Sequence, residues 1–119
     1  MDKLDKLLKT QSNLNTFIRK ERNLNYSLEE WILRWCRSLQ HEIIELEDEF
    51  NWKHWKNEKE IDWDNVKEEA IDILHFLLSI FDDLGMSGDE VYNEYIKKNE
   101  ENIKRQLGTS ERKGYELKK

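Results

Sequence analysis

The 119-residue sequence lacks proline and contains only four glycines and one cysteine. So few helix-breaking residues, together with few β-branched ones, argue against a β-sandwich or barrel and predict long helices in one domain. The single thiol, Cys36, excludes an internal disulfide framework. Because it also suits a reducing compartment, we expect a cytoplasmic protein.

Long hydrophobic runs are also missing. The longest apolar stretch, Ile71 to Phe81, is interrupted by three polar residues. It is also shorter than the ~20 apolar residues that cross a bilayer. The first ten residues include acids and no apolar segment. We therefore expect neither a membrane span nor a secretory signal.

Positive charge is in the minority, with 20 Lys and Arg against 26 Asp and Glu and a net charge of −6. This balance argues against bulk binding to nucleic acid or to an anionic membrane. Segment 104–119 is instead basic, with six lysines and arginines against two glutamates. An acidic body with a basic tail suggests a small anionic ligand held near acids, and a solvated, frayed tail is the alternative.

Apolar residues of the AVILMFWYC set make up 37% of the chain, and charged residues make up 39% against roughly 25% in an average domain. A chain this short and polar buries a small share of its surface. We therefore expect a partner subunit to supplement a thin core.

Four amphipathic segments predict four helices, over about residues 2–21, 27–50, 62–84 and 87–106. Ser27 with Glu30, and Ser87 with Glu90, have the spacing of capping boxes at the second and fourth helix starts. Gly85 and Gly108 suit the ends of the third and fourth helices, because glycine adopts a positive φ without a Cβ clash. The third segment is apolar on more than one face, which predicts a central helix.

Paired acids border the apolar stripes of the second and third helices. Glu42 and Glu45 are spaced i, i+3, and so are Glu69 and Asp72. If these helices pack antiparallel, the four carboxylates converge, and two charges ~4 Å apart repel by about 4 kcal/mol at an effective dielectric of 20. Such a group needs a counter-ion, and hard oxygen ligands suit Mg²⁺. The alternative is that each pair lies on a solvated helix face, because 26 acids in 119 residues give about five or six pairs at this spacing by chance.

A second set of polar residues suits a phosphate chain. Lys98, Asn102 and Arg105, spaced four and three, form one edge of the fourth helix. Arginine grips phosphate with two parallel hydrogen bonds, and lysine acts as a point charge. The tail adds Lys113, Tyr115 and Lys118. The alternative is a solvated helix end, where cations suit the macrodipole.

Amides and aromatic rings offer a third set, which suits a nucleobase. Gln11 and Asn15 lie i, i+4 on the first helix, and amides match both donors and acceptors of a pyrimidine edge. The candidate stacking surfaces are Trp52, Trp55 and Phe76. For these rings, and for His75, packing in the core is the alternative.

Together these residues resemble the all-α, dimeric-type dUTP pyrophosphatases of the MazG-like superfamily of nucleotide pyrophosphohydrolases. The segments that carry the resemblance are Glu42-Ile-Ile-Glu45, Trp52-Lys53-His54-Trp55-Lys56, Glu69-Ala-Ile-Asp72-Ile-Leu-His75-Phe76, the run from Lys98 to Gln106, and Gln11 with Leu14-Asn15. The resemblance covers nearly the whole chain.

The resemblance implies an oligomeric, MazG-like four-helix bundle, with a homodimer expected and a tetramer as the alternative. It implies a single catalytic domain over residues 1–106 and a basic tail, 107–119, that closes on phosphates. The implied activity is Mg²⁺-dependent hydrolysis of dUTP, and of dUDP, to dUMP. A related enzyme acting on dCTP or another nucleotide is the nearest alternative. A non-catalytic, acidic helical interaction protein is an alternative of another class.

The resemblance also implies a role for each candidate residue. The metal ligands are Glu42, Glu45, Glu69 and Asp72, and a glutamate of the first pair, Glu45 or Glu42, acts on the attacking water. The phosphate-binding residues are Lys98, Asn102, Arg105, Lys113, Tyr115 and Lys118. The residues that frame uracil are Gln11, Asn15, Trp55, His75 and Phe76.

Overall fold

The computed structural model describes residues 2–118, and it is all-α, as predicted. The helices are α1 (Lys3–Glu21), α2 (Leu28–Glu47), α3 (Trp63–Asp83) and α4 (Gly88–Leu107), and the described residues contain no strand. Over that same range, no helix is long and apolar enough to cross a membrane. Residue 1, the first of the predicted domain, and residue 119, the last of the predicted tail, lie outside the described residues.

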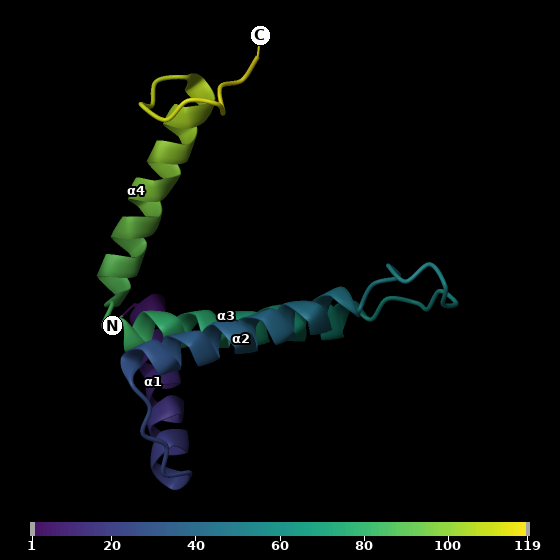
Figure 1. Ribbon diagram of the computed structural model, residues 1–119, viewed down its shortest axis with the longest axis vertical. Coiled ribbons are helices and arrows are strands. Elements are labelled where there is room, and N and C mark those ends of the chain that lie inside the picture. The colour runs from purple at the N-terminus through teal and green to yellow at the C-terminus, as the bar shows by residue number, and fades with distance from the viewer. Residues whose placement is uncertain (1, 119) are drawn as a thin grey trace. The chain divides into compact units, whose positions relative to one another are not determined.

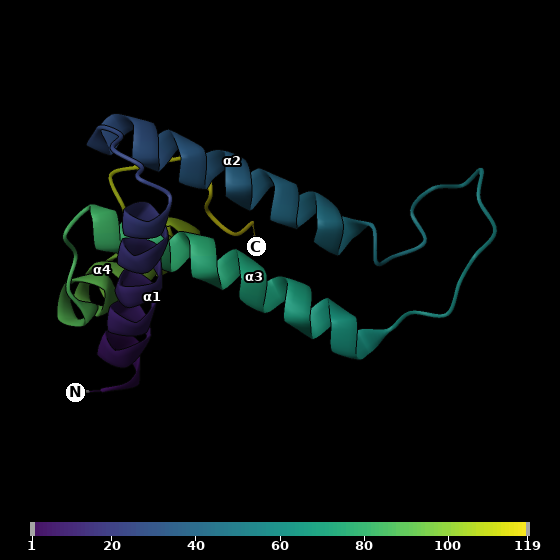
Figure 2. The same ribbon diagram turned by 90° about the horizontal axis from the view of Figure 1, so that it is seen from below.

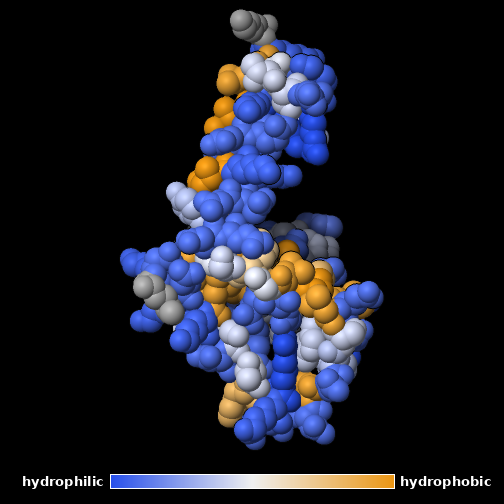
Figure 3. Space-filling view, turned by 90° about the vertical axis from the view of Figure 1, so that its left-hand side faces the viewer, coloured by the Kyte–Doolittle hydropathy of each residue, from blue (hydrophilic) through white to orange (hydrophobic). Residues whose placement is uncertain are grey.

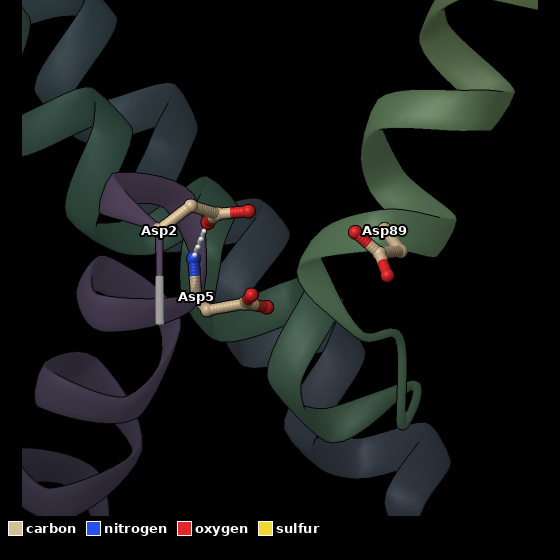
Figure 4. Close-up of side chains that lie close together, drawn as sticks. All are labelled: Asp2, Asp5 and Asp89. Carbon is tan, nitrogen blue, oxygen red and sulfur yellow. Dashed lines mark hydrogen bonds between the residues drawn. The ribbon is translucent and has the colours of Figure 1, made fainter.

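Polar side chains start each helix, because they accept hydrogen bonds from backbone N–H groups that have no partner in the first turn. The N-caps are Asp2, Ser27, Asp62 and Ser87. Figure 4 shows the first of these, where the Asp2 carboxylate accepts from the backbone N–H of Asp5 at 2.9 Å. Gly85 and Gly108 follow α3 and α4 with φ of 72° and 80°, as their positions in the sequence predict.

The chain forms two compact units, with the boundary between Gly85 and Met86. In the first unit, α2 and α3 run antiparallel and are joined by the loop over residues 48–62 (Figures 1 and 2). The central helix is α3, because it packs against both α2 and α1. Figure 2 shows α1 at the end of this hairpin that is away from the loop. The expectation of one catalytic domain over residues 1–106 stays a prediction.

The second unit consists of α4 and the tail, which folds back on the end of the helix. The backbone N–H of Leu117 donates to the carbonyl of Gln106 at 2.9 Å. The buried hydroxyl of Ser110 donates to Glu101 and accepts from the backbone N–H of Arg112 at 3.0 Å. The basic tail is therefore held to its own helix by hydrogen bonds.

The apolar core is thin, as the composition predicts. Among the described hydrophobic residues, only Leu8 and Leu78 are buried. Large apolar side chains are exposed on every helix, including Phe17 at 62%. Exposed apolar side chains on α4 include Ile96, Ile103 and Leu107, and Figure 3 shows orange patches along this helix.

Candidate active site

Three acids from two helices meet between α2 and α3, and they are named here the acid cluster. Its members are Glu42, Glu69 and Asp72, each of which offers a carboxylate oxygen within 4.8 Å of the other two. Antiparallel packing brings the second half of α2 against the first half of α3, and so the two predicted acid pairs face each other. Glu45 lies close enough for its charge to act on Glu42 and Glu69.

Crowding of negative charge changes the acidity of this cluster. Partial burial, and then the neighbouring charges of Glu45 and Asp72, raise the pKa of Glu42 above its ordinary value of 4.5. Partial burial, followed by the same two neighbours, raises the pKa of Glu69. Both shifts mean that the ionised form is disfavoured at this place in the fold.

Two oxygens of the acid cluster have no partner. Glu42 Oε2 and Glu69 Oε2 are buried, and neither accepts a hydrogen bond within the described residues. A buried polar atom without a partner is uncommon in folded proteins and points to a missing ion or ligand. Because all the atoms that could bind a metal here are carboxylate oxygens, the cluster fits a hard divalent cation such as Mg²⁺.

A row of polar contacts, named here the polar ladder, joins α1 to the second half of α3. It consists of Gln11, Asn15 and Arg19 on α1 and of His75, Ser79 and Asp83 on α3. His75 Nδ1 lies 2.6 Å from Gln11 Oε1, and Asn15 Nδ2 donates to Ser79 Oγ at 3.0 Å. Gln11 Nε2 also donates to Asn15 Oδ1 at 3.0 Å. The structure therefore brings together three of the predicted base-binding residues.

The acid cluster and the polar ladder are neighbours along α3, because His75 follows Asp72 by three residues. Phe76 lies beside them, with its ring centroid 5.9 Å from that of Trp35 on α2. It also lines a groove of about 380 Å³ next to the acid cluster. The residues lining this groove are Arg34, Arg37, Ser38, His41, Glu42 and Phe76.

Trp55, the remaining base-binding candidate, lies elsewhere. It belongs to the loop over residues 48–62, at the end of the α2–α3 hairpin that is away from α1 (Figure 2). Its side chain is 65% exposed and makes edge contacts with the rings of Trp52 and His54. Within this chain, the structure does not bring Trp55 to the polar ladder.

The predicted phosphate-binding residues belong to the second unit. Lys98 and Arg105 line a hollow of about 600 Å³ on α4, whereas Asn102 is outside its lining. Glu101 holds the guanidinium of Arg105 from 3.4 Å, and the Tyr115 ring lies 5.5 Å from it. Arg105 Nη2 is nevertheless buried without a hydrogen-bond partner in the described residues. The two tail lysines are exposed, and Lys113 Nζ donates to the carbonyl of Gly108 at 3.1 Å.

Sequence reasoning did not single out Ser79, Asp83 or Arg19, although a signal existed. Each of them follows a ladder residue of the same helix by four positions, so all lie on one helical face. Polar residues at this spacing within an apolar run are a signal for a polar contact between two helices.

Comparisons with known proteins agree with the family resemblance that the sequence motifs carry. A family model described as dUTPase matches residues 3–83. The dCTP pyrophosphatase of Enterobacteria phage T4 is 39% identical over 67 residues, which cover 46% of this chain and 39% of that protein. The chain therefore matches well under half the length of this relative. No solved structure matches the chain.

Proposed function

The chain belongs to the dUTPase family, and from this premise we propose that it hydrolyses dUTP, and also dUDP, to dUMP. The more general activity, pyrophosphohydrolysis of a nucleoside triphosphate, agrees with the name of the phage relative. The observation that carries the proposal is the acid cluster, where three carboxylates within 4.8 Å leave two buried oxygens without partners.

Glu42, Glu69 and Asp72 would hold Mg²⁺, with Glu45 at its side. When bound, the ion supplies a Lewis acid that neutralises the charge developing on the phosphoryl group and makes a nearby water a better nucleophile. The protein contributes a rigid set of oxygens, because each acid projects from the middle of a long helix.

Glu45 is the residue that we assign to the water. It is exposed, so water reaches it, whereas Glu42 is partly buried within the cluster. In the proposed step, the water oxygen forms a bond to one of the two phosphorus atoms of the linkage between the α- and β-phosphates, and the water proton passes to the Glu45 carboxylate. The P–O bond of that linkage breaks, and the products from dUTP are dUMP and pyrophosphate.

Arg105 and Lys98 are the proposed ligands of the phosphate chain, with Asn102, Lys113, Tyr115 and Lys118 in support. The unpartnered N–H of Arg105 Nη2 supports this role, because a buried guanidinium donor needs an acceptor such as a phosphate oxygen. Glu101 and the Tyr115 ring orient the guanidinium.

The polar ladder is the proposed base-binding end of the site. It places the His75 imidazole one helical turn from the acid cluster, with the two amides of α1 beside it, and Phe76 adds an aromatic face. The same amides suit cytosine if they are turned around. Hydrolysis of dCTP is therefore the second candidate, favoured by the name of the phage relative.

A panel of nucleotides tests the proposal. Pure protein is incubated with each dNTP and Mg²⁺, and released pyrophosphate is measured. We expect turnover of dUTP, and loss of that turnover in Asp72→Asn. No turnover of dUTP by the wild-type protein would end the proposal, and a preference for dCTP would favour the second candidate.

A non-catalytic interaction protein predicts a different outcome. In that case Mg²⁺ with a non-hydrolysable dUTP analogue leaves the melting temperature unchanged, whereas an enzyme is stabilised by mass action.

We also propose that the protein is a homodimer. Support comes from the thin core, with Leu8 and Leu78 as the buried hydrophobic residues of the described chain, and from large apolar side chains exposed on every helix. Light scattering coupled to size-exclusion chromatography tests this. A dimer mass is expected, a tetramer would revise the assembly, and a monomer would refute it.

A further inference from the structure

Ser79 is the most deeply buried polar residue of the polar ladder, with 0% of its surface exposed. Its hydroxyl donates to the backbone carbonyl of His75 at 2.8 Å. The same oxygen accepts from Asn15 Nδ2 at 3.0 Å. A hydroxyl has one proton, and here that proton is used by a carbonyl, which only accepts. Ser79 therefore presents to Asn15 an oxygen that only accepts.

The direction of the hydrogen bond between Asn15 and Ser79 fixes the directions of the next two contacts along the polar ladder. Asn15 must turn its Nδ2 toward Ser79, so its Oδ1 faces Gln11. Gln11 must then turn its Nε2 toward Asn15, which leaves its Oε1 facing His75 Nδ1 at 2.6 Å. That imidazole nitrogen must carry a proton, because two acceptors would repel each other. One buried hydroxyl therefore sets the orientation of two amides and the tautomer of one imidazole.

We propose that Ser79 is a positioning residue that sets the base selectivity of this chain, an inference that rests on the proposed function. Uracil presents an N3–H donor beside the O4 acceptor, whereas cytosine presents an N3 acceptor beside an N4 amino donor. An amide that fits one edge fits the other only after its oxygen and nitrogen exchange places. By fixing both amides, Ser79 makes that exchange costly, and the wrong base then leaves polar groups unpaired.

The direct test is Ser79→Ala, which removes the hydroxyl and frees Asn15 to turn. We expect the ratio of kcat/KM for dUTP to that for dCTP to move toward one by about tenfold, the effect of one buried hydrogen bond. A merely structural role changes both substrates alike and leaves the ratio unmoved. An unmoved ratio in a folded variant would therefore overturn the inference.

Thr10→Val is the matched control. The Thr10 hydroxyl donates to the carbonyl of Lys6, four residues earlier on α1, at 2.7 Å, just as Ser79 donates to that of His75. The control removes the same kind of bond from an exposed position outside the ladder. Its selectivity ratio should equal that of the wild type. If Ser79→Ala does not fold, Ser79→Cys replaces it, because a thiol of similar shape is a weak donor and acceptor.

Two readouts separate this inference from the proposed function. Affinities for dUMP and dCMP, measured by calorimetry, need no turnover, and their ratio should fall in Ser79→Ala. Nitrogen NMR of His75 should show the Nδ1–H tautomer in the wild type and a mixture in the variant. An inactive wild type that binds the two monophosphates unequally refutes the activity alone. Equal binding by the wild type refutes the inference.

Discussion

Asp83, at the end of the polar ladder, ties together all three helices of the first unit. Its carboxylate accepts two hydrogen bonds from Arg19 Nη2 on α1, at 2.8 and 2.9 Å. It also accepts from Trp35 Nε1 on α2 at 2.6 Å. The side chain of Asp83 is 8% exposed, so water offers little replacement for these contacts. We predict that Asp83→Asn destabilises the protein strongly although it preserves the shape of the side chain.

The expected loss follows from the groups left without partners. A hydrogen bond to a charged group contributes about 1.5–3 kcal/mol, and a carboxamide supplies one acceptor where the carboxylate supplies two. Arg19 keeps part of its stabilisation, because its side chain is 28% exposed and its guanidinium lies 3.9 Å from the Trp31 ring centroid. The free energy of unfolding should therefore fall by about 2–3 kcal/mol.

Urea denaturation at one fixed protein concentration measures this loss, because a proposed dimer makes stability depend on concentration. Glu30→Gln is the control, since it breaks an ion pair with Arg34 whose side chains are 41% and 47% exposed. An exposed pair contributes less than about 0.5 kcal/mol. If Asp83→Asn costs no more than Glu30→Gln, the network does not hold the helices together, and the reasoning is refuted.

Three further predictions concern charged groups. The fold raises the pKa values of Glu42 and Glu69 above 4.5, so folding favours the protonated form of both side chains. The contribution of these two side chains to stability is therefore largest at low pH. It declines as the pH rises from 4.5 to the raised pKa values, and it stays low at higher pH. In protein without added metal, Glu42→Gln should weaken this decline and raise the melting temperature at pH 7. The rise in melting temperature on adding Mg²⁺ should be smaller than in the wild type. An unchanged pH profile of stability would contradict this prediction. Ser110→Ala should speed hydrogen exchange of the Leu117 amide, because the Ser110 hydroxyl joins the tail to Glu101 on α4, a contact that also lowers the pKa of that carboxyl. Arg105→Gln should raise KM for dUTP at least tenfold, and an unchanged KM in steady-state kinetics would exclude the phosphate contact.

The helices and the acid cluster were predictable because both depend on local spacing. Ser27 and Ser87 mark helix starts by their chemistry alone, and each accepts the predicted backbone hydrogen bond. Spacing of three residues places Glu69 and Asp72 on one face, and the apolar stripes beside the two acid pairs bring those faces together when α2 and α3 pack antiparallel.

The register of α1 against α3 was not predictable in the same way. Gln11 and His75 are 64 residues apart, and nothing in their local sequences specifies which polar residue of α3 each amide meets. The reciprocal capping expected at Ser27 illustrates another gap. The Glu30 side chain pairs with Arg34 at 3.0 Å, because a guanidinium four residues ahead on the same helix competes for the carboxylate.

The Asp83 and Glu69 carboxylates on α3 differ in how fully their oxygens are paired, and this difference distinguishes a stabilising group from a candidate ligand site. Around Asp83, a buried carboxylate receives hydrogen bonds from Arg19 and Trp35, as expected for a group that stabilises the fold. Around Glu69, partly buried carboxylates face one another, and a buried oxygen of Glu69 remains without a partner. Such an arrangement lowers stability, and a bound cation of the kind proposed above would supply the missing charge. The unpaired oxygens, rather than the number of acids, are therefore the observation that supports the proposed metal site on this helix.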